Sequence, residues 1–358
     1  MIPCDRRPHM SHSSPGSRVA FVNSYPMDRC RQWWLDGQIP GHLIWGAQHL
    51  GDHHFEVDYV QHEKLTMLRR LRLGPFSWLD QQLRLIFRQT DIIYSGHYAN
   101  VTLLSYLRSR RILRKPLVCT VFMPPDNRAF FRRAYYGHDA FICLSHPLAA
   151  YLIEEQNVPA DRVFVVPWGT DLPFYGEWQA PPSDGPPLFV ATGKTDRDYQ
   201  TLVQAVDGLP MRLDIHCTNP DLSISVPDNV VFRSSSAVSY PELLTVLRRA
   251  SGVLIPTHAV SHMAGQTSLL DALGAGRASV MTRNPLVDID LEALGAGILV
   301  DPYDVAAWRR ALERLIADPS LTREMGRRAR RAAEDHLNLR RFAGDLAAVL
   351  RTVLARSH

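Results

Sequence analysis

The sequence lacks an apolar run of the roughly 18 residues that a membrane-spanning helix needs. Its five cysteines are scattered without paired spacing, which argues against both a disulfide framework and a zinc site. Cys119 and Cys143 lie inside apolar runs, so we expect them to be small buried side chains. No apolar segment of a signal peptide occurs at the start, and residues 1–16 are expected to form a disordered tail. Together these absences favour a cytoplasmic protein.

The composition is that of an ordinary globular protein, with 46% hydrophobic and 21% charged residues. A length of 358 residues predicts two domains. The net charge of +4 is uneven, because residues 1–172 hold 20 basic and 15 acidic residues. The excess lies in the run 69–72 and between Arg108 and Lys115. Such clusters can meet a phosphorylated ligand, an anionic membrane or nucleic acid, or can form a solvated helix face.

Apolar runs alternate with helical patterns along the whole chain. Strands are predicted at residues 18–23, 55–60, 91–94, 116–122, 140–145, 162–167, 188–192, 212–217, 230–232, 252–256, 277–282 and 297–302. The predicted helices include residues 76–89, 99–113, 147–156, 198–207, 240–249, 304–317, 319–335 and 339–355. A long loop is expected after the first strand. Because most of these strands are apolar throughout, the fold class is α/β with parallel sheets covered on both faces.

Residues 172–187 interrupt this alternation with five prolines and two glycines, as in an interdomain linker. We expect two doubly wound sheets whose carboxyl edges face a common cleft, where ligands bind. The expected divisions are an N-terminal domain over 17–172, a linker over 173–187, a C-terminal domain over 188–336, and a last helix over 337–358 that returns to the N-terminal domain.

Residues 265–276 read as a turn and a helix between two apolar strands. Gly265 allows the backbone to come close to a ligand, and Thr267 or Ser268 is expected to cap the helix. The first amides of the helix favour an anion. Asp271, about one turn into the helix, is suited to accept hydrogen bonds from sugar hydroxyls. This stretch is therefore the first candidate site.

Several landmarks in chain order resemble the retaining GT-B glycosyltransferases, especially glycosyltransferase family four. They are Ser145, the turn Val165-Val166-Pro167-Trp168-Gly169-Thr170-Asp171, Gly193-Lys194 with residues 197–202, residues 265–276, and residues 297–304. The resemblance covers roughly residues 138–350, and the first 137 residues match mainly in strand order. It rests on the ordered set, since no single motif is specific.

The resemblance implies a GT-B fold of two Rossmann-like domains, with a nucleotide diphosphate sugar bound to the second domain and an acceptor to the first. It also implies sugar transfer with retention of anomeric configuration, without a metal or other cofactor. Lys194 and Arg197, beside Gly193, take the places of the family's diphosphate-binding cations. Departure of a diphosphate without a metal requires cations and amide donors to hold the developing charge.

By the same resemblance Asp271 is expected to bind ribose hydroxyls, and the helix amides at Gln266 and Thr267 to meet phosphate. Gly37 and Gly41 correspond to a glycine loop whose amides approach the donor from the other domain. The expected acceptor is a glycan, a lipid-linked compound or a small molecule. The basic N-terminal domain adds a candidate contact with an anionic membrane, so that the protein would be peripheral at its inner face; nucleic acid is not an expected partner.

The sequence departs from the family at the sugar end of the site. Met263 stands where the family has the first of two glutamates, which contacts the donor sugar, and Gln266 is a substitute polar group. His97, at the end of a strand, is the nearest candidate catalytic residue. Two alternatives stay open: a GT-B sugar-nucleotide epimerase, and a nucleotide-sugar-binding protein that has lost catalysis. The nucleobase, the sugar and the acceptor are left undetermined.

Overall fold

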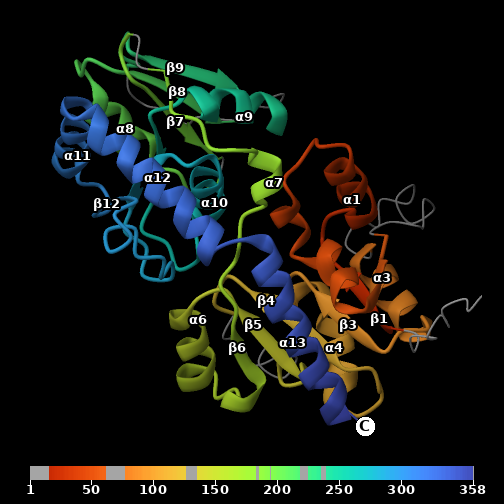
Figure 1. Ribbon diagram of the computed structural model, residues 1–358. Coiled ribbons are helices and arrows are strands. Elements are labelled where there is room, and N and C mark those ends of the chain that lie inside the picture. The colour runs from red at the N-terminus through yellow and green to blue at the C-terminus, as the bar shows by residue number, and fades with distance from the viewer. Residues whose placement is uncertain are drawn as a thin grey trace, which may run out of the picture.

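A computed structural model describes residues 16–61, 77–125, 135–182, 185–193, 195–217, 225–234 and 239–357. The expected N-terminal tail, apart from Gly16, lies outside these residues, as do the basic run at 69–72 and Lys194. The chain forms two domains, each built on a parallel sheet, with the C-terminal helix running along the first domain (Figure 1). The prediction of two doubly wound parallel sheets is confirmed.

The N-terminal sheet has the strand order β2-β1-β3-β4-β5-β6, and all its pairs are parallel. Its strands are β1 (Ser17–Val22), β2 (Phe55–Tyr59), β3 (Ile92–Ser95), β4 (Leu117–Val121), β5 (Ala140–Cys143) and β6 (Val163–Val165). Successive side chains of β1 point to opposite faces, so Ala20 and Val22 join one apolar cluster and Val19 and Phe21 another. Burial on both faces explains why these strands are apolar without alternation.

The C-terminal sheet has the order β12-β11-β10-β7-β8-β9, again with parallel pairs. Its strands are β7 (Leu188–Thr192), β8 (Arg212–Cys217), β9 (Val230–Ser234), β10 (Gly252–Ile255), β11 (Ala278–Thr282) and β12 (Gly297–Val300). The strand order reverses direction between β7 and β10. Ligands of doubly wound sheets bind in the crevice at such a reversal.

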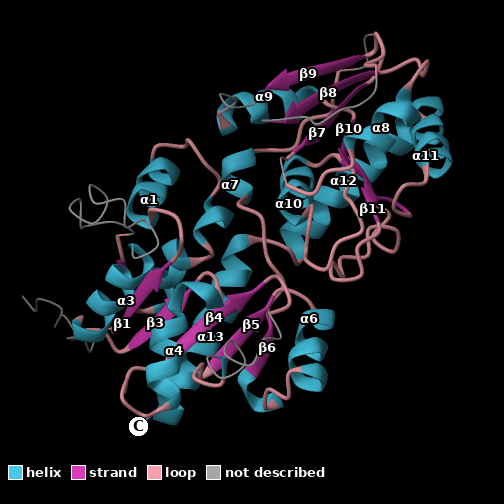
Figure 2. Cartoon of the chain, turned by 180° about the vertical axis from the view of Figure 1, so that it is seen from behind, coloured by secondary structure: helices cyan, strands magenta, loops and turns pink. Residues whose placement is uncertain are grey.

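Helices cover both faces of each sheet (Figure 2). Those of the first domain are α1 (Met27–Leu35), α3 (Ser77–Phe87), α4 (Thr102–Ser109) and α6 (His146–Ala150), which continues as a π-helical turn (Tyr151–Glu155). Helix α7 (Leu172–Tyr175) lies in the connection between the domains. Those of the second domain are α8 (Tyr199–Val206), α9 (Tyr240–Arg249), α10 (Gln266–Ala275), α11 (Val305–Ala317) and α12 (Pro319–Asp335), followed by α13 (Leu339–Ser357). Among the described helices, none is long and apolar enough to cross a membrane.

The long loop predicted after the first strand is wrong in part, because α1 occupies Met27–Leu35. Asp28 lies in its first turn, where a carboxylate complements the positive end of the helix. Met27 and Cys30 are buried, and Trp34 packs against the same cluster. The intervals of three and four residues between Met27, Cys30 and Trp34 are those of one face of a helix. The two neighbouring tryptophans make this pattern hard to see in the sequence.

Helix α13 lies against the N-terminal domain, as the blue ribbon in Figure 1 shows. Phe342 on this helix is buried and faces Gly46, where an added Cβ would lie 2.8 Å from the Phe342 ring. Gly46 has a φ of +73°, a conformation that also favours glycine. The close contact with Phe342 and the positive φ both require a glycine at residue 46. They therefore determine how closely α13 packs against the first domain.

We predict that Phe342→Ala lowers the free energy of unfolding by about 3–5 kcal/mol, since it leaves a cavity under α13. Urea denaturation followed by circular dichroism measures the change. Arg340→Ala is the matched control, because the Arg340 side chain is 74% exposed and should contribute less than about 0.5 kcal/mol. Equal losses in the two variants would contradict the assigned role of Phe342.

Candidate active site

A cavity of about 540 Å³ lies where the two domains meet. The first domain contributes a mostly apolar wall, made of Tyr25, Trp45, Phe122, Met123 and Trp168. The second contributes the loop after β7, the end of β8, α9, and the turn and helix after β10. The cavity thus opens at the reversal of strand order between β7 and β10, where sheet topology places a ligand.

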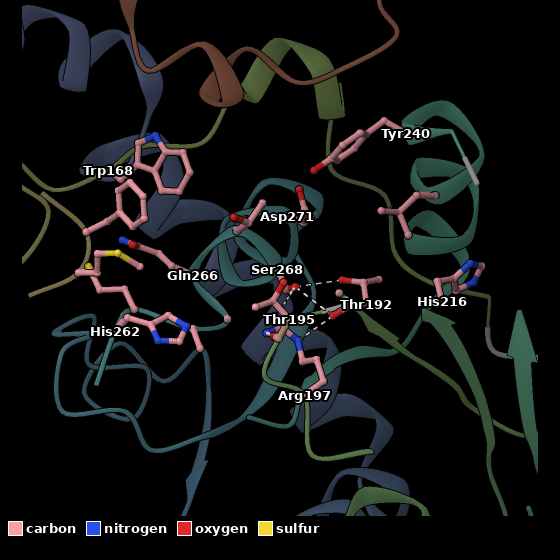
Figure 3. A pocket seen from close by; sticks show the side chains of 18 of the residues that line it. Trp168, Thr192, Thr195, Arg197, His216, Tyr240, His262, Gln266, Ser268 and Asp271 are labelled. Carbon is pink, nitrogen blue, oxygen red and sulfur yellow. Dashed lines mark hydrogen bonds between the residues drawn. The ribbon is translucent and has the colours of Figure 1, made fainter. Parts of the chain in front are cut away.

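Side chains surround the cavity in three groups (Figure 3). These are Asp271, Ser268 and Arg197 in the centre, Tyr240 and His216 on one side, and Gln266, His262 and Trp168 on the other. Asp271 is the one carboxyl among the described residues that line the cavity.

Arg197 is held against the end of β7 by its own hydrogen bonds. Its Nε donates to the Thr192 carbonyl at 3.0 Å and its Nη2 to Ser268 Oγ at 3.0 Å. Gly193 makes room for it, because an added Cβ would lie 2.5 Å from Nη2. Burial lowers the pKa of Arg197, and within the described chain no carboxylate lies within salt-bridge distance of it. A partly buried cation that contacts no carboxylate favours an anionic ligand.

The turn before α10 has the geometry expected of Gly265. The residue occupies the N-cap position with a φ of +88°, and an added Cβ would lie 2.7 Å from Ile255 Cγ2. The expected capping of the helix by Thr267 or Ser268 is wrong, since no side chain caps it and Ser268 instead contacts Thr192 at 3.0 Å. The amides of the first turn therefore have no side-chain acceptor at the N-cap, which leaves them suited to an anion.

Asp271 is buried, 3% exposed, at the wall of the cavity. Its Oδ1 accepts a hydrogen bond from the Tyr175 hydroxyl at 2.5 Å and lies 3.8 Å from His42 Nε2. Burial raises the pKa of Asp271 to about 7, against the effect of the Tyr175 bond. Burial also lowers the pKa of His42 to about 3, so the imidazole is neutral at neutral pH. The carboxyl thus sits in a dry, uncharged surrounding contributed by both domains.

Three candidate residues of the first domain lie away from the described lining of the cavity. The Gly41 amide donates to Asp171 Oδ2 at 2.6 Å, and Gly37 forms a turn after α1 with a φ of +67°. His97 uses its Nδ1 to accept from the Ala99 amide at 3.3 Å, and burial lowers its pKa to about 4. Its ring lies at a tilt of 41° to Phe122, with centroids 4.8 Å apart, and Phe122 does line the cavity.

Sequence reasoning did not find Tyr175, Tyr240 and the stacked rings of Trp45 and Trp168 as parts of the site. Tyr175 lies at the edge of the proline-rich linker, where no periodic pattern marks it. Trp168 carried a signal, because it replaces asparagine in a turn that otherwise resembles the family. In the described part of the chain no cluster of three or more His, Cys, Asp or Glu side chains is arranged to hold a metal ion.

One family model and several solved structures resemble this chain. Residues 42–174 match the family model described as Glycosyltransferase Family 4, which overlaps the stretch 138–350 that carries the sequence resemblance. The sequence matches no curated protein. The fold resembles sucrose-phosphate synthase from Thermosynechococcus elongatus, with a TM-score of 0.70 at 15% identity over 95% of this chain and 100% of that one.

The fold is therefore GT-B, and the family model for Glycosyltransferase Family 4 matches a part of the first domain. A glycosyltransferase from Rickettsia africae is similar with a TM-score of 0.70 at 12% identity, over 96% of this chain and 99% of that one. Anabaena Alr3699/HepE in complex with UDP-glucose is similar with a TM-score of 0.63 at 14% identity, over 94% and 99%. The GT-B prediction made from the sequence is confirmed.

The buried carboxyl gives this GT-B chain a defined pH dependence. The pKa of Asp271 is higher in the folded state than its ordinary value of 3.8, so folding favours the protonated form. Stability from this group is complete below about pH 4 and is lost as the pH rises towards 7, by at most about 4 kcal/mol. Tyr175, Tyr240 and His42, which surround it, have pKa values outside this range.

We predict that Asp271→Asn removes this dependence, because the amide cannot titrate. Urea unfolding at pH 5 and at pH 7.5 should show the wild type losing stability relative to the variant as the pH rises. Parallel curves for the two proteins would show that the carboxyl is not the titrating group.

Proposed function

We propose that this protein transfers a sugar from a nucleotide diphosphate sugar to an acceptor hydroxyl, with retention of anomeric configuration and without a metal. The observation that carries the proposal is the placement of Arg197. Its guanidinium lies at the cavity, beside the N-terminus of α10, and has no carboxylate partner within the described residues. A cation and helix amides converging on one point form a site for the diphosphate.

The three groups of side chains suggest how the donor lies. The diphosphate would sit over Arg197 and the first turn of α10, with Lys194 as the second cation. The nucleoside would extend towards Asp271 and Tyr240, and the sugar towards Gln266 and Trp168, as Figure 3 allows. The UDP-glucose named in the Anabaena structure supports a nucleotide sugar as donor. This pose leaves the acceptor to enter from the N-terminal domain.

In the proposed reaction the bond between the anomeric carbon and the diphosphate breaks as the acceptor oxygen attacks from the same face. The leaving phosphate oxygen takes the acceptor proton, so a protein base is not required. Arg197, Lys194 and the amides of Gln266 and Thr267 would stabilise the charge that develops on the diphosphate. His97 is a poor base in this setting, since its pKa is lowered to about 4.

We predict that one nucleoside diphosphate among UDP, GDP, dTDP and ADP raises the melting temperature of the wild type. Arg197→Ala and Lys194→Ala should each weaken that nucleotide about 10–100-fold, as expected for a lost charged hydrogen bond. Calorimetric titration measures the affinities. Arg283→Ala is the matched control, because this arginine pairs with Glu292 and Asp301 outside the cavity.

The absence of any nucleotide-induced shift would overturn the proposal, and unchanged affinity in both variants would overturn the assigned roles. Product analysis with the bound nucleotide's sugar donors separates the reaction classes. Transfer to an acceptor supports the glycosyltransferase, whereas release of an epimerised sugar nucleotide supports the epimerase. Binding without turnover would identify a protein that has lost catalysis.

We also propose that the first domain contacts an anionic membrane surface. Phe87, at the end of α3, is 85% exposed, and Ile112, after α4, is 68% exposed. Lys115 joins the two segments, because its Nζ donates to the carbonyls of Leu85 and Ile86 at 2.9 and 2.8 Å. Two exposed apolar side chains therefore lie on neighbouring segments.

The basic cluster has two parts. Arg108 forms two hydrogen bonds with Asp139, at 3.1 and 2.8 Å, and Lys115 binds carbonyls of α3, so both stabilise the fold. The remaining members are exposed: Arg110, Arg111 and Arg114. Exposed arginines beside exposed apolar side chains match the headgroups and acyl boundary of an anionic bilayer.

We predict that the double variant Phe87→Ser/Ile112→Ser reduces co-sedimentation with phosphatidylglycerol vesicles more than tenfold, because each apolar side chain contributes roughly 1 kcal/mol or more on insertion. Phosphatidylcholine vesicles should bind the wild type weakly. Val226→Ser, at a 42% exposed side chain of the second domain, is the control. Wild-type binding that is equal on both lipids, or unaffected by the double variant, would contradict the proposal.

A further inference from the structure

The two ends of the cavity differ in chemistry, and this difference bears on the sugar that is transferred. The inference rests on the proposed function. The nucleoside end offers a carboxyl, a phenol and an imidazole, from Asp271, Tyr240 and His216. The opposite end is lined mainly by aromatic rings and thioethers: Trp45, Phe122, Met123, Trp168 and Met263.

The aromatic rings at the sugar end form one stacked group. Trp45 lies against Trp168 with ring centroids 4.5 Å apart and planes 3° apart. Trp45 also stacks with Phe122, at 5.5 Å and 22°. Trp168 is buried, 5% exposed, and Trp45 and Phe122 pack against the same apolar core. The wall is therefore closely packed. Apart from the indole N–H groups, of which Trp168 Nε1 is buried, its side chains carry no strong hydrogen-bonding group.

Met263 closes this wall from the second domain. Its side chain is 7% exposed, and its amide donates to the Phe122 carbonyl of the first domain at 3.3 Å. The bond places the Met263 backbone beside Phe122 at the seam between the domains. Met263, Phe122 and Trp45 line the same cavity and belong to the same apolar cluster.

Gln266 and His262 lie on the same side of the cavity as Trp168 (Figure 3). Gln266 is 3% exposed, and its side-chain amide makes no hydrogen bond to any described residue. Figure 3 shows it extending towards Trp168. His262 also lines the cavity, but its Nε2 lies 3.2 Å from Asp196 Oδ2 and is partly engaged. One free amide cannot satisfy the several hydroxyls of a hexose.

We propose that the transferred sugar is a 6-deoxyhexose, whose methyl group packs against Met263 and the stacked rings while a ring hydroxyl bonds to Gln266. A hydroxyl placed against this wall would lose its water without gaining a partner. A methyl group in its place gains the hydrophobic contact instead. An apolar pocket of this kind separates a methyl from a hydroxylated analogue by about 10–100-fold.

The test compares intact donors that differ at carbon 6 alone, so that no acceptor needs to be known. The pairs are UDP-glucose with UDP-6-deoxyglucose, dTDP-glucose with dTDP-6-deoxyglucose, GDP-mannose with GDP-6-deoxymannose, and ADP-glucose with ADP-6-deoxyglucose. Titration calorimetry is done with the pair whose nucleoside diphosphate binds. The deoxy donor should bind about 10–100-fold more tightly. Equal affinity, or tighter binding of the hydroxylated donor, would overturn the inference.

Variants at residue 263 test whether the preference for the deoxy donor comes from the apolar wall of the cavity. Met263→Leu keeps the surface apolar and should retain the preference, whereas Met263→Gln, of similar length, should reduce it. Thermal denaturation and the affinity for the free nucleoside diphosphate report whether each variant is folded. If no nucleoside diphosphate binds to the wild type, the proposed function fails. If one binds but the carbon 6 preference is absent, the specificity proposal alone is wrong.

Discussion

The chain crosses between the two domains twice, and hydrogen bonds between the two crossing segments set the shape of the cleft. The Thr170 amide donates to the Leu337 carbonyl at 2.8 Å, and the Leu339 amide donates to the Thr170 carbonyl at 2.9 Å. Gly169 permits this approach, because an added Cβ would lie 2.2 Å from the backbone of Asn338. The chain therefore leaves and re-enters the first domain at one point. The two crossings hold the carboxyl edges of the two sheets so that they face each other, and the cavity lies beside the crossings.

The same junction explains why the ribose-binding candidate is not an isolated acid on a helix. Tyr175 belongs to α7, directly after the first crossing, and its hydroxyl is bound to Asp271 in the second domain. His42 approaches the same carboxyl from the first domain. A change in the angle between the domains would alter both contacts at once. The Asp271 side chain is thus held by residues outside the second domain.

Much of this fold follows from pattern in the sequence, because parallel strands buried on both faces are apolar throughout. The strands β7 and β8 begin and end where the apolar runs do, and Gly265 marks the turn before α10 by a backbone conformation that glycine favours. Helix α1 was missed because polar residues separate its few apolar positions, and burial of Met27 and Cys30 stabilises it in the fold. Tyr175 could not have been found, since its role depends on a contact across 96 residues that local pattern does not encode.

In the candidate site, too, some features follow from the local sequence and others from contacts between distant residues. Arg197 and Gly193 are close in sequence, and the glycine leaves the space that the guanidinium fills, so one motif specifies both. The sugar end is different, because its wall is assembled from strand ends and turns of the first domain and from Met263 of the second. At Met263 the resemblance to the family shows that a carboxylate is absent from the sugar end. The fold shows that a thioether and aromatic rings line this end instead. Aromatic stacking and the Met263–Phe122 bond hold that wall in place, so residues of both domains would contribute to the proposed sugar specificity.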